Sequence, residues 1–222
     1  MNLSKYIDHT LLKPDASLKD IERLCSEAIN YGFYSVCVNP YRVDDCKRML
    51  KGTDVKVCSV VGFPLGANQI EVKAFEVKSL IEKGVDEIDY VVNIGAVKDG
   101  NFKVVEQEMR EIVGLAKPYN VVVKAIIEVP LLNSKEIEKV CKVLTSVDFV
   151  KTSTGFNVRP VTVEDVKILK KFVKEGVKIK AAGGIRSYKL ALELVKAGAS
   201  RLGCSRSVDL IKQSYSEEFS SH

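Results

Sequence analysis

The chain has 222 residues, of which 46% are hydrophobic and 28% charged, and its formal net charge is +5. This length and composition favour one soluble domain with a sizeable core. Basic and acidic residues are interspersed without a block of like charge, which argues against a nucleic-acid-binding surface. No apolar stretch reaches membrane-spanning length.

Short β-branched segments alternate eight times with longer amphipathic segments along the chain. The predicted strands cover residues 6–12, 34–39, 56–63, 87–93, 121–128, 148–153, 177–184 and 200–205. The predicted helices cover residues 17–31, 41–50, 68–83, 101–117, 134–145, 162–175, 187–197 and 206–213. Three of these helices begin at a capping residue with an acid three positions later: Ser17 with Asp20, Asn68 with Glu71, and Thr162 with Asp165.

Strict alternation of strands and helices predicts a parallel sheet covered by helices. Eight units of this kind predict an α/β fold of the (β/α)₈ TIM barrel type, as a single domain over residues 1–213. A doubly wound sheet is the second choice, and it is weakened because no strand is followed by a G-x-G-x-x-G turn. Residues 214–222 are expected to form a polar C-terminal tail.

Cysteine and histidine usage limits the chemistry. None of the six cysteines forms a C-x-x-C pair, so they are expected to be reduced thiols of a cytoplasmic protein, and the N-terminus lacks the apolar core of a signal peptide. The chain has two histidines, and His222 is its last residue. A metal-dependent aldolase or hydrolase draws on several His or Cys ligands close together, so we expect neither a metal nor another cofactor.

Two lysines stand at the ends of neighbouring apolar strands, where a barrel places its functional groups. Lys151 ends the segment Asp148–Lys151, and Lys180 lies in the next strand before two glycines. Neighbouring strands are about 4.8 Å apart, so the two amines should be close together. Each would then make protonation of the other harder, and burial would add to this, which suits an amine nucleophile. The structural alternative is a salt-bridged strand end.

Two further charged residues bear on this interpretation. Lys124 is a rival lysine, but it lies four residues before the strand-end Glu128 and should sit deeper, in a structural ion pair. Asp89 is expected across the barrel mouth from the lysines. A carboxylate there would either move protons through water or only compensate charge, and the residues alone leave both roles open.

Glycines follow the last three predicted strands, as Thr154–Gly155, Gly183–Gly184 and 203–205. In a barrel, these loops often bind phosphate through backbone N–H groups. A single glycine would indicate only a tight turn. Clusters after three consecutive strands favour a phosphate site.

The segments IDHTLLKP, VCVNP, VGFPLG, DEIDYVVNIG, VKTSTGF, KAAGGIR and RLGCS, in this order, resemble the deoxyribose-phosphate aldolases, which are class I Schiff-base aldolases. The resemblance spans residues 7 to about 212. It implies a lyase of deoxyribonucleotide catabolism that reversibly cleaves 2-deoxy-D-ribose 5-phosphate to acetaldehyde and D-glyceraldehyde 3-phosphate. The implied partner is therefore a small phosphorylated sugar, and the family is expected to form homo-oligomers.

The resemblance also implies roles for individual residues. The imine-forming lysine falls on Lys151, and the proton relay falls on Lys180 and Asp89. The remaining implied residues bind substrate: Asp8, Thr10 and Cys37 line the pocket, and Gly155, Gly183, Gly184, Gly203 and Ser205 bind the phosphate. The sequence departs from the family pattern at residues 157–161 and at Arg206, both near the expected phosphate.

Two other functions are compatible with the predicted barrel. One is a non-catalytic phosphosugar-binding protein, which would have no need to retain Lys151, Lys180 and Asp89 together. The other is a phosphosugar isomerase, which would rely on an acid–base pair of Glu, Asp or His and would not require Lys151.

Overall fold

The computed structural model describes residues 2–219, with side chains described as far as residue 214. Eight parallel strands close into a barrel in sequence order, and β1 pairs with β8 through Ile7 opposite Leu202. The strands are β1 (Ile7–Leu11), β2 (Ser35–Val38), β3 (Lys56–Val61), β4 (Glu87–Val91), β5 (Val122–Ile126), β6 (Phe149–Lys151), β7 (Lys178–Ala182) and β8 (Arg201–Cys204). The predicted (β/α)₈ fold is confirmed.

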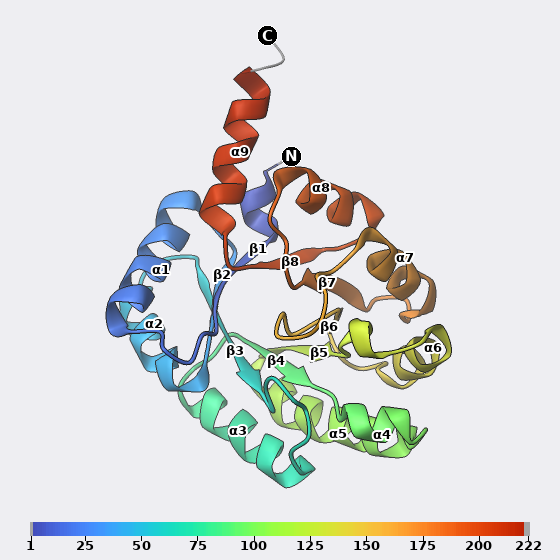
Figure 1. Cartoon of the computed structure of the whole chain (residues 1–222). Coiled ribbons are helices and arrows are strands. Elements are labelled where there is room, and N and C mark those ends of the chain that lie inside the picture. The colour runs from blue at the N-terminus through green and yellow to red at the C-terminus, as the bar shows by residue number, and fades with distance from the viewer. Residues whose placement is uncertain (1, 220–222) are drawn as a thin grey trace.

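Helices surround the barrel, as Figure 1 shows. They are α1 (Leu18–Tyr31), α2 (Val43–Met49), α3 (Ile70–Glu82), α4 (Ile94–Lys98), α5 (Phe102–Ala116), α6 (Ser134–Val143), α7 (Val163–Phe172), α8 (Tyr188–Ala197) and α9 (Ser207–Phe219). Within the described residues, the 3₁₀ turn η1 (Leu3–Tyr6) precedes β1, and η2 (Pro40–Arg42), η3 (Lys117–Tyr119) and η4 (Val129–Leu131) lie in the connections. Helix α4 was not predicted, and α9 continues past residue 213 and projects beyond the ring of helices (Figure 1).

Local capping explains where several helices begin. The Ser17 hydroxyl accepts a hydrogen bond from the Asp20 backbone while the Asp20 carboxylate accepts one from the Ser17 backbone, and Thr162 and Asp165 cap α7 in the same way. The predicted cap at Asn68 is wrong, because α3 begins one residue later, after Gln69, and has no side-chain cap.

A large apolar core lies between the outer faces of the strands and the helices. Branched residues such as Ile88, Val150 and Leu202 point outward into it. Because side chains alternate along a strand, their neighbours Asp89, Lys151 and Arg201 point into the barrel. Within the described residues, no helix is long and apolar enough to span a membrane.

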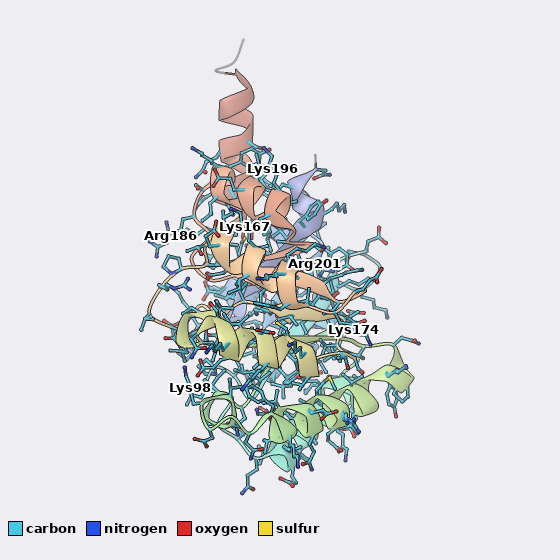
Figure 2. All side chains as sticks on the ribbon, turned by 90° about the vertical axis from the view of Figure 1, so that its right-hand side faces the viewer. Lys98, Lys167, Lys174, Arg186, Lys196 and Arg201 are labelled. Carbon is cyan, nitrogen blue, oxygen red and sulfur yellow. The ribbon has the colours of Figure 1, made fainter. Side chains whose placement is uncertain are left out.

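The surface cations are dispersed. Figure 2 shows Lys98, Lys167, Lys174, Arg186 and Lys196 spread over the face that includes α6, α7 and α8, and all five are exposed. Arg201 is labelled in the same view, but only 5% of it is exposed. Its position inside the barrel sets it apart from these surface charges.

Candidate active site

Seven charged side chains occupy the barrel interior, where barrels of this kind usually pack bulky branched residues. They are Asp8, Glu87, Asp89, Lys124, Lys151, Lys180 and Arg201, and none is more than 5% exposed. Burying a charge is costly unless it is paired and hydrogen-bonded. The arrangement of their ion pairs therefore determines which of these side chains are charged and which can exchange protons.

Lys151 and Lys180 lie side by side, as predicted, because β6 and β7 pair these two residues directly. Both amines donate to the same oxygen of Asp89: Lys151 Nζ lies 2.8 Å and Lys180 Nζ 2.7 Å from Asp89 Oδ2. The structure thus brings the three predicted catalytic residues into direct contact. Asp89 accepts hydrogen bonds from both amines. This contact fits charge compensation, one of the two roles that the sequence left open for Asp89.

The charge state of Lys180 differs from the expectation. Burial alone would lower the pKa of Lys180, but ion pairs with Asp8 and Asp89 outweigh it and raise the pKa above its ordinary value. The Asp8 Oδ2 atom lies 2.5 Å from Lys180 Nζ. The expectation that Lys180 is hard to protonate was wrong because it considered only the neighbouring amine and burial, and left out two carboxylates.

Lys124 lies deeper in the barrel, as expected from its position in the strand. Its Nζ atom is 2.5 Å from Glu87 Oε2 and 2.9 Å from Asp89 Oδ1. Burial would raise the pKa of Asp89, but the attraction of Lys124, Lys151 and Lys180 is larger and lowers it well below the usual range. Asp89 is therefore a carboxylate that stays ionised among three lysines.

Asp8, Thr10 and Cys37 were predicted to line the substrate pocket, and they occupy neighbouring positions on β1 and β2. Asp8 is fully buried and accepts a hydrogen bond from Ser35 Oγ at 2.7 Å. Thr10 is half-buried near the end of β1, and its hydroxyl donates to the Asp8 carbonyl at 2.8 Å. Cys37 is fully buried beside its strand neighbour Cys58.

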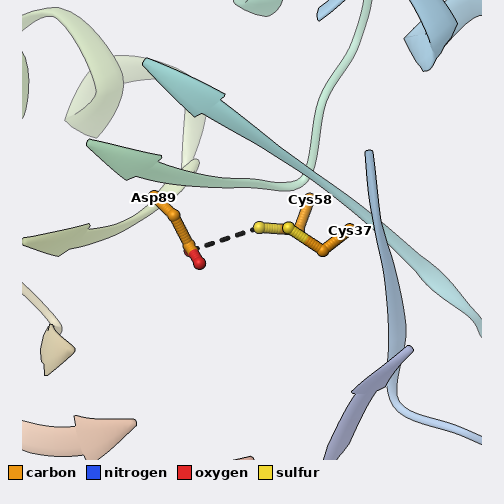
Figure 3. A group of neighbouring side chains, drawn as sticks. All are labelled: Cys37, Cys58 and Asp89. Atoms are coloured by element: carbon orange, nitrogen blue, oxygen red, sulfur yellow. Dashed lines mark hydrogen bonds between the residues drawn. The ribbon is translucent and has the colours of Figure 1, made fainter. Parts of the chain in front are cut away.

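Cys37, Cys58 and Asp89 form a group whose potential metal-ligating atoms lie within 4.8 Å of one another (Figure 3). The Cys58 thiol donates to Asp89 Oδ1 at 3.2 Å. Both oxygens of Asp89 are also bonded by lysine ammonium groups, so a cation would have to displace them. We therefore regard the two thiols as neighbours of the charged network. All six cysteines of the chain are buried free thiols.

The predicted phosphate-binding glycines pack tightly against one another. A Cβ atom on Gly183 would lie 3.4 Å from the Gly155 Cα, and one on Gly184 would lie 2.5 Å from Pro160 Cβ. Both Gly183 and Gly184 have positive φ angles, of 101° and 70°, which also favours glycine. The turn after β7 thus lies against the β6–α7 connection, and only glycine allows this approach.

Gly203 and Ser205 lie at the end of β8. A Cβ atom on Gly203 would lie 2.8 Å from Ala182 Cβ and 3.3 Å from Lys180 Cε, so this glycine makes room for the lysine. Ser205 and Arg206 are exposed and line a cavity of about 340 Å³ between α1 and the start of α9. Arg159, the charged residue of the altered 157–161 loop, instead binds the Asp165 carboxylate at 2.7 and 2.8 Å.

The structure adds residues that sequence reasoning did not assign to the site. Glu87 and Arg201 belong to the interior cluster, and the alternation Glu87–Asp89 and Arg201–Gly203 was the signal that could have found them. Glu128, seen only as a strand-end residue, accepts a hydrogen bond from the Thr154 hydroxyl at 2.5 Å. That contact holds the loop after β6 against the end of β5.

Two aromatic side chains meet at the mouth of the barrel. The rings of Phe63, after β3, and Phe156, after β6, are 5.4 Å apart and perpendicular. Phe63 packs on a small apolar cluster that includes Leu12 and Val60. Lys151 is only 2% exposed, so its amine is largely closed to water.

Comparison with known proteins identifies the family. A model of the DeoC/LacD aldolase family matches residues 3–203. The chain belongs to this family. A deoxyribose-phosphate aldolase of Aciduliprofundum boonei is 51% identical over 95% of this chain and 96% of its own length. One from Clostridium tetani is 49% identical over 96% of this chain and 100% of its own length.

A solved structure of a family member supports the same assignment. The deoxyribose phosphate aldolase from Aeropyrum pernix, described as a unique tetrameric structure, superposes with a TM-score of 0.91 at 36% identity. The match covers 97% of this chain and 92% of that one. The resemblance drawn from the sequence motifs is confirmed, and the chain is an aldolase.

Proposed function

We propose that this chain reversibly cleaves 2-deoxy-D-ribose 5-phosphate to acetaldehyde and D-glyceraldehyde 3-phosphate through an imine on Lys151. One observation carries the proposal: the Lys151 amine is buried at the end of β6 and is held by a carboxylate oxygen that it shares with Lys180. An amine fixed in a dry pocket beside proton-carrying groups suits carbonyl attack. The names of relatives half identical to this chain support the substrate.

The covalent steps follow from the chemistry of an amine and an aldehyde. The neutral Lys151 amine adds to C1 of the open-chain sugar, and loss of water gives a protonated imine. Removal of the C3 hydroxyl proton then forms the C3 carbonyl and breaks the C2–C3 bond. The electron pair of that bond passes to the imine and leaves an enamine. Protonation at C2 and addition of water release acetaldehyde and restore the amine.

Lys180 and Asp89 are the groups placed to exchange protons with these intermediates. The Lys180 ammonium lies 2.7 Å from Asp89 Oδ2, the same atom that accepts from Lys151. The Asp89 carboxylate is therefore placed to accept a proton released at Lys151, and the Lys180 ammonium is placed to donate one. This gives Asp89 a second role besides charge compensation.

The substrate phosphate is proposed to bind at the turns that follow β6, β7 and β8. Gly155, Gly183 and Gly184 lie close together there, and all three have positive φ angles, which favour glycine. Ser205 adds a hydroxyl next to the first turn of α9, whose N-terminus favours an anion. Arg206 is exposed beside Ser205, whereas Arg159 is held by Asp165.

Chemical trapping tests the imine directly. The protein is incubated with acetaldehyde, reduced with borohydride, digested and analysed by mass spectrometry. The expected result is an ethyl group on the peptide that carries Lys151, with none on the neighbouring lysine Lys180. A protein that is not modified at Lys151 would contradict the mechanism, and it would favour a phosphosugar-binding protein without this chemistry.

We further propose that copies of the chain associate into a homo-oligomer. Support comes from the tetrameric structure of the Aeropyrum pernix relative and from exposed apolar residues around α3. Leu65 and Phe75 are 74% and 73% exposed, and Val72 lies one helical turn before Phe75. Light scattering in solution should give a molar mass that is a multiple of 24.6 kDa. A Phe75→Lys variant should shift that mass towards a single chain, and a wild-type protein that is already monomeric would refute the proposal.

A further inference from the structure

The interior charges form a closed ring in which cations and carboxylates alternate. Asp8 contacts Arg201 at 2.8 Å and Lys180 at 2.5 Å. Asp89 contacts Lys180 at 2.7 Å and Lys124 at 2.9 Å. Glu87 completes the circuit, because it contacts Lys124 at 2.5 Å and Arg201 at 3.1 Å. Each carboxylate of this ring thus bridges two of its cations, and each cation bridges two carboxylates.

Lys151 stands outside this ring. The ring holds three cations and three carboxylates and is electrically neutral, whereas Lys151 touches only Asp89, through an oxygen already bonded by Lys180. A protonated Lys151 would therefore leave one uncompensated positive charge in a buried cluster. Such a charge is costly in a region of low dielectric constant. Among the interior basic side chains, Lys151 has one carboxylate partner, whereas Lys124, Lys180 and Arg201 have two each.

We infer that Arg201 and Glu87, by closing the ring at the far end of the barrel, determine that Lys151 is the lysine that gives up its proton. The inference rests on the proposed function, in which Lys151 must be neutral to attack. Arg201 and Glu87 are the first residues of β8 and β4, whereas Lys151 is the last residue of β6. They are positioning residues, which act through Asp8, Lys124 and Asp89.

The other basic residues of the ring, Lys124 and Arg201, are expected to stay protonated. Burial alone would lower the pKa of Lys124, but Asp89 and Glu87 raise it above the ordinary value. Arg201 keeps its charge at any pH of interest, and its guanidinium group also lies 3.5 Å from the centre of the Tyr34 ring. The permanent cation is therefore at the closed end of the barrel, and the lysine that can lose its proton is at the open end.

Other titratable groups near Lys151 are few, within the described residues. The thiols of Cys37 on β2 and Cys58 on β3 face the interior, and Glu128 follows β5. A hydrogen bond from Cys58 contributes most to lowering the pKa of Cys37, while burial raises that of Cys58. These groups stay the same in every variant below, so their influence cancels when the variants are compared.

The test measures how the capture of Lys151 depends on pH. Wild type and variants react with excess acetaldehyde and cyanoborohydride, which forms the N–C bond, expels water and reduces the imine by hydride. The rate at which the Lys151 peptide gains an ethyl group is followed by mass spectrometry. On the acid side this rate falls as the amine is protonated, and the pH of half-maximal rate reports its charge state.

The two single variants should shift the pH of half-maximal rate in opposite directions, because one removes a negative charge from the ring and the other removes a positive charge. Glu87→Gln leaves the ring with an excess positive charge, so the half-maximal pH should fall by about one unit, as expected for unit charges roughly 10 Å apart at an effective dielectric constant of about 20. Arg201→Met leaves an excess negative charge that a protonated Lys151 would neutralise, so the half-maximal pH should rise by about one unit. Arg201→Lys keeps the charge and is the matched control, with no shift expected.

The double variant Glu87→Gln/Arg201→Met separates this charge effect from mere loss of structure. It restores a neutral ring, so its half-maximal pH should return to the wild-type value. Shifts of the same sign in both single variants, or no shift in a folded Glu87→Gln protein, would overturn the inference. Absence of any Lys151 adduct in wild type would instead contradict the proposed function, so the two failures are distinguishable.

Discussion

Replacement of Lys151 by alanine should reduce kcat/KM for cleavage of 2-deoxy-D-ribose 5-phosphate by about 10⁴-fold or more, because no other amine is placed to form the imine. Lys180 is the nearest alternative, but it is held by Asp8 and Asp89. Steady-state rates of acetaldehyde release measure the effect. The fold should persist, because the ring of three cations and three carboxylates remains closed without Lys151.

Two measurements make this result specific. Lys178→Ala, which removes an exposed lysine at the start of β7, should leave the rate within about twofold of wild type. The Lys151→Ala protein should bind inorganic phosphate about as tightly as wild type in calorimetry, because the glycine turns are unchanged. Turnover above about 1% of wild type in Lys151→Ala would exclude an essential imine at this residue. A protein that fails to fold would mean that Lys151 is mainly structural.

The contact among Lys151, Lys180 and Asp89 was predictable because it depends on local rules. Side chains alternate along a strand, and sequential strands of a barrel pair with their neighbours, so inward-facing lysines at matching positions of β6 and β7 had to lie together. Asp89 faces inward in the same way on β4, two residues after Glu87. Period-two patterning and strand order together determine which groups face the interior.

The closed ring could not be predicted from the same rules. Arg201 on β8 reaches Glu87 on β4, two strands that are not neighbours in the sheet. Which residues meet across a barrel depends on strand tilt and stagger, which a hydrophobic pattern does not specify. Lys124 was expected to form a structural ion pair, and it does, but its partners and the position of Arg201 follow only from the three-dimensional register.

The sequence also could not show which arginine near the expected phosphate site is free to bind an anion. Both Arg159 and Arg206 lie near the expected anion in the sequence, and arginine suits phosphate recognition. In the structure, Arg159 is committed to Asp165, an acid in the first turn of α7 that also accepts from the Thr162 backbone. The helix-capping residue Asp165 therefore binds Arg159, whereas Arg206 remains exposed beside Ser205. Charge patterning alone cannot distinguish these two outcomes.

Replacement of Asp89 by asparagine should destabilise the protein by about 3–5 kcal/mol, because one buried partner of several charges is removed. The Asp89 carboxylate accepts from Lys124, Lys151 and Lys180 at 2.7 to 2.9 Å, and an amide offers one oxygen and two N–H donors in its place. For a chain of this length, the loss corresponds to a decrease in Tm of roughly 6–20 °C, measurable by calorimetry. Turnover should fall with it, because Lys151 and Lys180 lose their shared oxygen.

The pH dependence of this loss has a defined sign. Burial acts to raise the pKa of Asp89, but its three lysine neighbours lower it well below the ordinary value, so the stabilisation is fully present above the unfolded-state pKa. The stability difference between wild type and Asp89→Asn should therefore be constant near neutral pH. It should shrink as the pH falls below about 4 and the folded carboxylate is protonated.

A compensating substitution separates the electrostatic role of Asp89 from its chemical one. Asp89→Asn removes one carboxylate from the ring of three cations and three carboxylates, so the additional change Lys124→Met removes the excess positive charge and should recover part of the lost Tm. Asp15→Asn, at an exposed carboxylate, is the matched control and should leave Tm unchanged. Activity should stay low in the double variant, because the oxygen that joins Lys151 to Lys180 is still missing. If Tm did not recover, charge balance would not explain the instability, and if activity recovered together with Tm, Asp89 would be needed only for folding.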